Sequence, residues 1–164
     1  MLVIEQLKGL GWIEMNFHPI IVHFPIALLL TSVFFDFLAL LLKPQSALQT
    51  AAFYLLILGV LFGIAAGISG DSAAQALSES HHFHPDIQVH ADFANGTIWL
   101  SILLLVSRAY FTIRGHFFSG WKAAYLILGL VTACLLSMTG YLGGRLVFEH
   151  GLGVKSASER ARNP

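Results

Sequence analysis

Two histidines and two prolines stand at the start of the first long apolar run, in the stretch FHPIIVHFPIALLL (17–30). Histidine is costly in the hydrocarbon region of a bilayer, so an imidazole placed there usually has a partner or a function. Another histidine, His90, opens a later apolar run, and His150 follows the last one. Imidazole is the common axial ligand of haem iron and also suits zinc, copper and iron ions. The sequence therefore indicates a centre built from imidazoles.

The helical spacing favours His23 and His90 as the pair that faces a shared ligand. Small residues follow His90 on its face of a helix, each within about 40° of it: Ala94, Thr97 and Ser101. His23 is followed on its own face by small residues in the same way, at Ala27 and Thr31. Both histidines lie near the same membrane surface, and bundle cores commonly hold cofactors between facing helices. We therefore expect a flat porphyrin between two helices, with His23 and His90 as axial ligands.

His18 is expected to support this pair or to replace one of its members. It lies five residues before His23, so about 140° away around a regular helix, and the two cannot point at one centre. Pro19 disfavours helical geometry at His18, which frees that side chain to act as a cap or a supporting donor. Pro25 removes a backbone hydrogen bond and can bend the helix, so it can also change the direction of His23.

The segment GYLGGRLVFEHGLGV (140–154) ends the last apolar run with groups that could contact a cofactor. Gly143 and Gly144 would let a cofactor or another helix approach closely. Arg145 would pair with a haem propionate or with Asp92, and His150 would supply a further imidazole on the same surface. The other interpretation is an ordinary helix C-terminus, where glycine and basic residues are favoured.

The composition predicts an integral membrane protein. Of the 164 residues 56% are hydrophobic and only 11% are charged. Four apolar runs reach the length of about 20 residues that a helix needs to cross a bilayer core, and they cover residues 19–42, 48–69, 90–112 and 122–148. We expect an all-α, integral membrane four-helix bundle over residues 16–154. Residues 1–15 are expected to form a short interfacial helix, and residues 155–164 a polar tail.

The distribution of charge gives the expected orientation. Four spans put seven of the eight histidines on one side of the membrane, the exception being His116. The two connections on the other side carry no acidic residue, and their basic residues are Lys43, Arg108, Arg114 and Lys122. Short basic loops prefer the cytoplasm, so we expect an inner-membrane protein whose histidine-rich face is periplasmic. Asp36, within the first span, requires a partner, for which Arg108 is the candidate.

Several function classes are excluded by what the sequence lacks. Cys134 is the single cysteine, so there is no internal disulfide, covalent c-type haem attachment or thiolate cluster. The formal net charge is zero and no basic face exists, which excludes nucleic-acid binding. No nucleophile triad, phosphate-binding glycine loop or HExxH motif occurs. The chain is therefore expected to be an electron carrier or a subunit rather than a stand-alone enzyme.

Three segments carry a resemblance to a known family: HPIIVHFPIALLLTSVFFD (18–36), VHADFANGTIWL (89–100) and the segment 140–154. Over residues 16–154 the chain resembles an uncharacterised bacterial four-helix membrane domain of unknown function. Members of that family occur alone or joined to c-type cytochrome or Rieske domains, and the family looks like a distant relative of membrane b-type cytochromes. The resemblance implies redox company. The family's recurrent histidines correspond here to His18, His23, His90 and His150.

The sequence thus predicts a membrane b-type cytochrome-like protein that binds haem b non-covalently near one membrane face. His23 and His90 would be the axial ligands, and the supporting residues would be His18, His150, Arg145 and Gly144. Because two imidazoles fill both axial positions of the iron, the expected role is electron transfer, between a quinol in the lipid bilayer and a periplasmic redox carrier.

Two alternatives remain open at this point. In the first, His23 and His90 hold a zinc, copper or iron ion in a binding or transport protein, with Asp92 and Glu149 as further ligands. In the second, the chain is a structural subunit of a larger membrane complex or a homo-oligomer. Stripes of small residues, which allow close helix packing in lipid, support the second. They are Gly59, Gly63, Gly67 and Gly70 in one span, and Ala133, Ser137, Gly140 and Gly144 in another.

Overall fold

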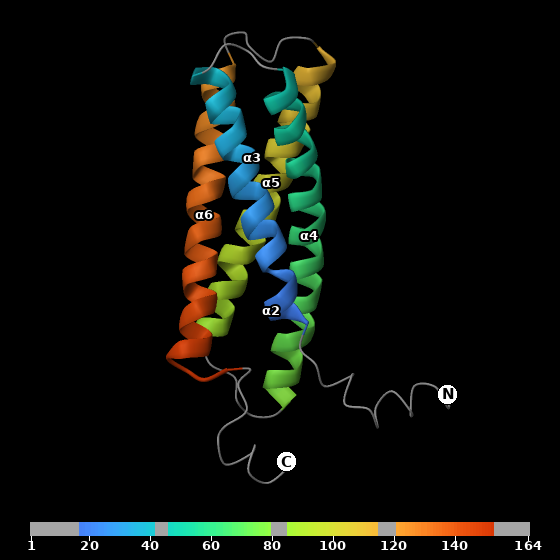
Figure 1. Cartoon of the computed structure of the whole chain (residues 1–164). Coiled ribbons are helices and arrows are strands. Elements are labelled where there is room, and N and C mark those ends of the chain that lie inside the picture. Colours follow the sequence, from blue (N-terminus) through green and yellow to red (C-terminus); the bar gives the residue numbers. More distant parts are fainter. Residues whose placement is uncertain (1–16, 42–45, 80–84, 115–120, 153–164) are drawn as a thin grey trace, which may run out of the picture.

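The computed structural model describes residues 17–41, 46–79, 85–114 and 121–152. Four long helical segments run up and down side by side in one bundle (Figure 1). The elements are α2 (His18–Ile21), α3 (His23–Leu41), α4 (Ser46–Glu79), α5 (Pro85–Ile113) and α6 (Lys122–Phe148). Within these described residues, four spans are long and apolar enough to cross a membrane: His18–Ala39, Ala47–Gln75, Pro85–Ile113 and Lys122–Phe148. The predicted all-α membrane four-helix bundle is confirmed. The expected interfacial segment 1–15 and tail 155–164 lie outside the described residues.

The first span consists of two helices, because proline interrupts its hydrogen bonds. Pro25 has no N–H with which to reach the carbonyl of Ile21. The helix is accordingly broken at Val22, and the next backbone bond, from Ile26 N to Val22 O, is long at 3.4 Å. Pro19 lies in the first turn of α2, where a missing N–H costs nothing. The helix therefore begins at His18, one position earlier than expected.

Helix α4 continues ten residues beyond its predicted end at residue 69. It reaches Glu79 and has 34 residues, which is about 51 Å at 1.5 Å per residue. A bilayer core is about 30 Å thick, so the last turns of α4 extend beyond it. The prediction followed the apolar run, which fades after Ser69. The helix continues because SAAQALSE (72–79) is rich in alanine and other good helix formers.

Each helix packs against two neighbours. Helix α3 contacts α4 and α6, and α5 also contacts α4 and α6, so that α3 and α5 lie on the diagonal of the bundle. The apolar core between them contains Leu29, Leu56, Val60, Leu104, Tyr125 and Leu136. Many large apolar side chains point outwards instead, such as Phe34 and Trp99. That distribution suits a bundle surrounded by lipid, where an outward apolar side chain is not exposed to water.

A polar cluster joins all four long helices at the end of the bundle opposite the start of α2. Arg108 Nη1 lies 3.1 Å from Asp36 Oδ1, which confirms the predicted partner of Asp36. The Tyr125 hydroxyl donates to Asp36 Oδ2 over 2.6 Å, and Arg108 Nη2 donates to the carbonyl of Gln49 over 2.9 Å. These four residues come from α3, α4, α5 and α6.

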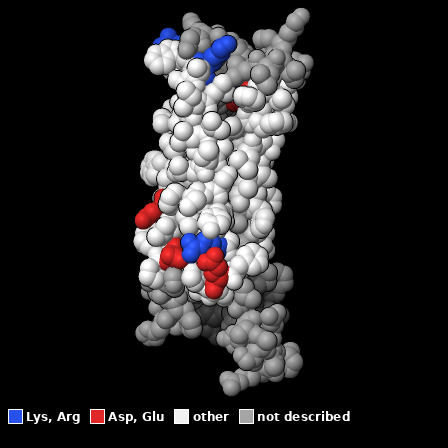
Figure 2. All heavy atoms as spheres, turned by 90° about the vertical axis from the view of Figure 1, so that its left-hand side faces the viewer, with Lys and Arg blue, Asp and Glu red and all other residues white. Residues whose placement is uncertain are grey.

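Exposed charge lies near the two ends of the bundle. Figure 2 shows the side on which α6 lies: basic side chains lie near the upper end, acidic side chains gather with a basic one nearer the lower end, and uncharged residues form the surface between them. An uncharged belt of this kind matches the hydrocarbon region of a bilayer, in which backbone polar groups are satisfied within the helices.

Candidate functional site

His18 and His90 lie close together inside the bundle, near the end where α2 and α5 begin. We call this pair of imidazoles the histidine centre. Their ring centroids are 6.5 Å apart, and the ring planes are nearly perpendicular at 82°. Both side chains are half-buried. Since α2 leads into α3, and α3 and α5 lie on a diagonal, the two imidazoles approach each other across the interior of the bundle.

The His18 ring is held by a backbone carbonyl of α4. Its Nδ1 lies 3.0 Å from the carbonyl oxygen of Ala66 and 3.0 Å from Ser69 Oγ, while Ser69 Oγ itself donates to that carbonyl over 3.0 Å. A carbonyl oxygen only accepts, so His18 Nδ1 carries the hydrogen. In a neutral imidazole this places the lone pair on Nε2, the nitrogen that is then able to bind a metal.

The His90 ring is held in the same way by α6. Its Nδ1 lies 3.1 Å from the carbonyl oxygen of Thr139, so Nδ1 again donates and the lone pair lies on Nε2. The hydroxyl of Thr139 is 3.0 Å from the hydroxyl of Thr97, which links α6 to α5 beside the imidazole. Thr97 and Ser101 are buried, so the predicted groove of small residues below His90 does face the interior.

His23 lies on the outside of the bundle, which corrects the expectation that it faces the same space as His90. Its side chain is exposed, and its Nδ1 donates to the carbonyl of Pro19, 2.6 Å away in the preceding turn. The predicted angle of about 140° between His18 and His23 is the reason: when one points inwards, the other points outwards. His18 is the one that points inwards, where its Nδ1 reaches the carbonyl of Ala66 on α4.

Gly143, rather than Gly144, is the glycine that contacts the histidine centre. A Cβ atom on Gly143 would lie 3.1 Å from His90 Cε1, whereas one on Gly144 would meet nothing within 4 Å. On α4, a Cβ atom on Gly70 would lie 3.0 Å from His18 Cε1. The glycine stripe of α4 was expected to serve helix packing alone, so Gly70 is a site residue that the sequence reasoning missed.

Arg145 and His150 lie at the end of the bundle, where they contact acidic side chains. His150 Nε2 is 3.0 Å from Asp86 Oδ2. Arg145 Nε is 2.9 Å from Glu149 Oε2, and its Nη2 is 3.7 Å from Asp86 Oδ2. Of the two partners expected for Arg145, Asp92 is not the one that it contacts here: Arg145 pairs with Glu149 and Asp86, and Asp92 accepts from Gln88 over 2.8 Å. Asp86 precedes His90 by one helical turn, so this cluster borders the histidine centre.

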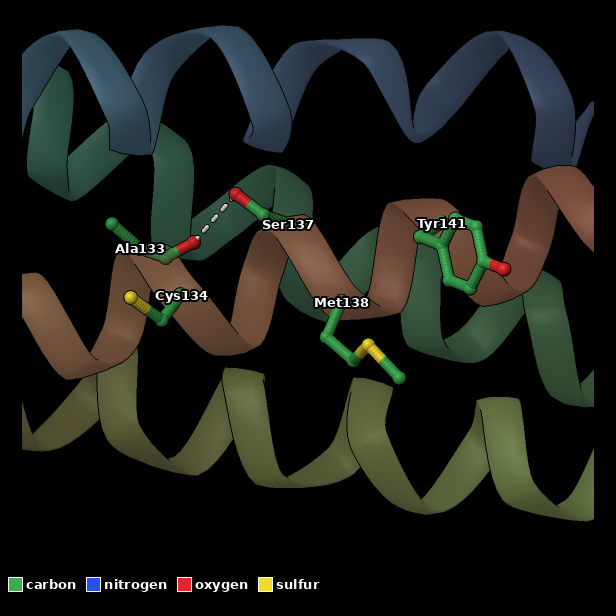
Figure 3. Close-up of a pocket in the computed structure, with 5 residues that line it drawn as sticks. All are labelled: Ala133, Cys134, Ser137, Met138 and Tyr141. Carbon is green, nitrogen blue, oxygen red and sulfur yellow. Dashed lines mark hydrogen bonds between the residues drawn. The ribbon is translucent and has the colours of Figure 1, made fainter.

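The described parts of the chain contain no group of three or more His, Cys, Asp or Glu side chains that could hold a metal ion. His81, His82 and His84 lie outside the described residues. A shallow groove runs along α6 and is lined by small and apolar side chains, with Cys134 and Met138 beside the Ser137 hydroxyl that donates to Ala133 (Figure 3). This groove contains neither His18 nor His90, so it is separate from the histidine centre.

Comparison with known proteins gives one result. Residues 14–156 match the family described as predicted membrane protein, DUF2231. Comparison with curated proteins and with solved structures gave no match. The matched region begins just before His18 and ends just after His150, so it includes the whole described bundle. This chain therefore belongs to the DUF2231 family of predicted membrane proteins.

Proposed function

We propose that this protein is a membrane electron carrier that binds haem b non-covalently, with His18 and His90 as the axial ligands. The observation that carries the proposal is the pair of inward-facing imidazoles. With metal–nitrogen bonds of about 2 Å, two imidazoles on opposite sides of one metal have ring centroids roughly 6 Å apart. The observed separation is 6.5 Å. The angle of 82° between the ring planes does not argue against this arrangement, because the separation of the ring centroids does not depend on that angle.

The set of donor groups fits haem better than a bare ion. A zinc site in a protein takes three or four protein ligands, and no third ligating side chain joins His18 and His90 among the described residues. Haem iron needs only one or two ligands from the protein, since the porphyrin supplies the others. The immediate surroundings of the imidazoles on α4 and α6 are small: Ala66, Ser69, Gly70, Thr139 and Gly143.

When bound, haem supplies a one-electron redox centre. The residues of this chain would hold it and set its properties. The carbonyls of Ala66 and Thr139 fix the orientation of the two rings and make their Nε2 atoms more basic, as hydrogen bonds to the far nitrogen of a ligating histidine generally do. If His18 and His90 both bound the iron, no position would remain open on it, and this would favour electron transfer over oxygen chemistry. Arg145 is the cation nearest this end of the bundle in the described chain and would attract the carboxylates of the cofactor.

The proposed orientation in the membrane rests on the basic residues at the end of the bundle away from the histidines. Arg114 and Lys122 are exposed at the end of the bundle away from the histidines, and short basic connections favour the cytoplasmic side. We therefore place the protein in the inner membrane, with the histidine centre near the periplasmic face. A quinol in the bilayer would be the electron donor, and a soluble periplasmic redox carrier would be the acceptor.

The test is the visible spectrum of the protein purified in mild detergent after expression with a haem supply. We expect a Soret band and, after reduction with dithionite, the sharp α and β bands of a six-coordinate b-type haem. His18→Ala and His90→Ala should each abolish these bands. His23→Ala is the matched control, because it removes an imidazole from the same helical region but from the outer surface. A colourless wild-type protein would contradict the proposal, as would bands lost in His23→Ala and kept in His18→Ala.

A further inference from the structure

The two histidines are held by half-sites of the same construction. We define a half-site as a histidine, the carbonyl that accepts from its Nδ1, and the glycine against its Cε1. The first consists of His18, Ala66 and Gly70, and the second of His90, Thr139 and Gly143. The accepting carbonyl follows the histidine by 48 residues in the first half-site and by 49 in the second. In both, the glycine comes four residues after the carbonyl.

The spacing of four residues has a physical cause. In an α-helix the carbonyl of residue j accepts from the N–H of residue j+4, so a second donor must approach over residue j+4. A side chain at that position would cover the carbonyl. Glycine leaves it open, and the imidazole occupies the space: the missing Cβ atoms would lie 3.0 Å from His18 Cε1 and 3.1 Å from His90 Cε1. Each glycine therefore allows an imidazole to bond to a carbonyl that is already part of a helix.

The half-sites also occupy matching positions in the bundle. His90 follows His18 by 72 residues (90 − 18), and Arg108 follows Asp36 by the same number (108 − 36). Each of these pairs makes a contact across the interior of the bundle. A position on α2–α3 therefore corresponds to the position 72 residues later on α5. Gly143 follows Gly70 by 73 residues (143 − 70). The same offset of 73 relates buried positions of α4 to buried positions of α6: residues 52, 56, 59 and 63 to residues 125, 129, 132 and 136.

We propose that an approximate two-fold axis along the bundle relates the hairpin of α2–α3 and α4 to the hairpin of α5 and α6, and that the ligand of the histidine centre lies on this axis. Each hairpin then contributes one equivalent half-site, and Gly70 and Gly143 are the positioning residues. This inference rests on the proposed function for the identity of the ligand, a metal complex with two opposite axial positions. The equivalence of the half-sites rests on the hydrogen bonds and glycine contacts alone.

The first experiment measures haem bound by full-length glycine variants. Gly70→Ala and Gly143→Ala should each lower the affinity for haem, by the 10–100-fold that loss of a supporting hydrogen bond commonly costs a metal site. The matched controls are Gly63→Ala on α4, whose Cβ would meet only Pro25 Cβ at 3.9 Å, and Gly144→Ala on α6, whose Cβ would meet nothing within 4 Å. They should keep wild-type affinity. A lower affinity for haem in only one of the two variants, Gly70→Ala or Gly143→Ala, would overturn the inference.

The second experiment needs no haem. Imidazole ¹⁵N NMR of the haem-free, histidine-labelled protein should show the rings of His18 and His90 as neutral and protonated on Nδ1. The variants His18→Ala and His90→Ala distinguish their signals from those of the other histidines, among them His23, whose Nδ1 also donates to a carbonyl. Gly70→Ala should change the His18 signals alone, and Gly143→Ala the His90 signals alone. A ring protonated on Nε2 instead, or one unaffected by its own glycine variant, would overturn the inference. A protein with both signals that never binds haem would contradict the proposed function and leave the half-sites standing.

Discussion

Asp36 and Arg108 form a buried ion pair between diagonal helices, with Arg108 Nη1 3.1 Å from Asp36 Oδ1 and both side chains no more than 3% exposed. The pair lies 18 residues along its helices from His18 and His90, so the bundle has one polar pair across its interior near each end. Between the two pairs lies the apolar core, which includes Leu29 and Leu104. The histidine centre and the ion pair are therefore separate features of the interior.

Removing either charge of the buried pair should destabilise the bundle strongly. Asp36→Leu and Arg108→Leu each leave a buried charge without its partner, which costs about 3–5 kcal/mol. The double variant should be more stable than either single variant, because no lone charge remains. Thermal unfolding in detergent, followed by circular dichroism, measures these differences. Equal stability of wild type and both single variants would show that the ion pair does not hold the helices together.

The partly exposed contact between Asp86 and His150 should behave differently. Its side chains are 33% and 24% exposed, and partly exposed pairs are screened by water and salt and contribute little. Asp86→Asn should therefore change the melting temperature far less than Asp36→Leu does. Added salt should remove any difference in melting temperature between wild type and Asp86→Asn. Asp92→Asn, an exposed carboxylate of the same helix, is the control. A loss comparable to that of Asp36→Leu would mean that this pair fixes the end of the bundle.

The hydroxyl of Tyr125 should contribute to stability through its bond to Asp36. Tyr125→Phe removes a donor 2.6 Å from a buried carboxylate, and hydrogen bonds to charged groups contribute roughly 1.5–3 kcal/mol. The same substitution at Tyr141, which is exposed on the same helix, should have no measurable effect. Unfolding of the two variants under identical conditions makes the comparison. Equal stability of Tyr125→Phe and Tyr141→Phe would mean that Arg108 alone stabilises the Asp36 carboxylate.

The fold could be predicted from the sequence because its signals are local. Long apolar runs mark the spans, and the last one matches α6 at both ends, residues 122 and 148. The partner of Asp36 was also predictable, since a carboxylate within a span needs a cation and Arg108 was the candidate at the same end. The end of α4 was missed, because hydropathy marks where a span ends and not where a helix ends.

The histidine centre was only partly predictable. Helical periodicity gave the 140° between His18 and His23, but it could not tell which of the two faces inwards. That choice depends on the direction from which α4 and α6 approach, which is a tertiary property. The carbonyls of Ala66 and Thr139 gave no signal at all, because every residue has a carbonyl. Gly70 was visible only as a member of a small-residue stripe, which by itself indicates close packing. Gly143 was visible as one of two adjacent glycines that could let a cofactor or another helix approach, and the sequence could not tell which of the two does so.

Gly59 should be the glycine whose replacement damages the packing of α3 on α4 most. A Cβ atom there would lie 2.7 Å from Leu29 Cδ2 and 3.2 Å from the backbone nitrogen of Leu29, and the backbone cannot move aside without shifting the helix. Gly59→Ala should therefore cost about 1–3 kcal/mol, as overpacking of a core commonly does. Gly144→Ala should cost nothing, since its Cβ would meet no atom within 4 Å. Leu29→Ala removes a core side chain and is itself destabilising, so the cost of Gly59→Ala is measured again in the Leu29→Ala background. It should be smaller there but still present, because the backbone contact remains. No cost in that background would show that the side chain of Leu29, and not the approach of the two helix backbones, sets the requirement for glycine.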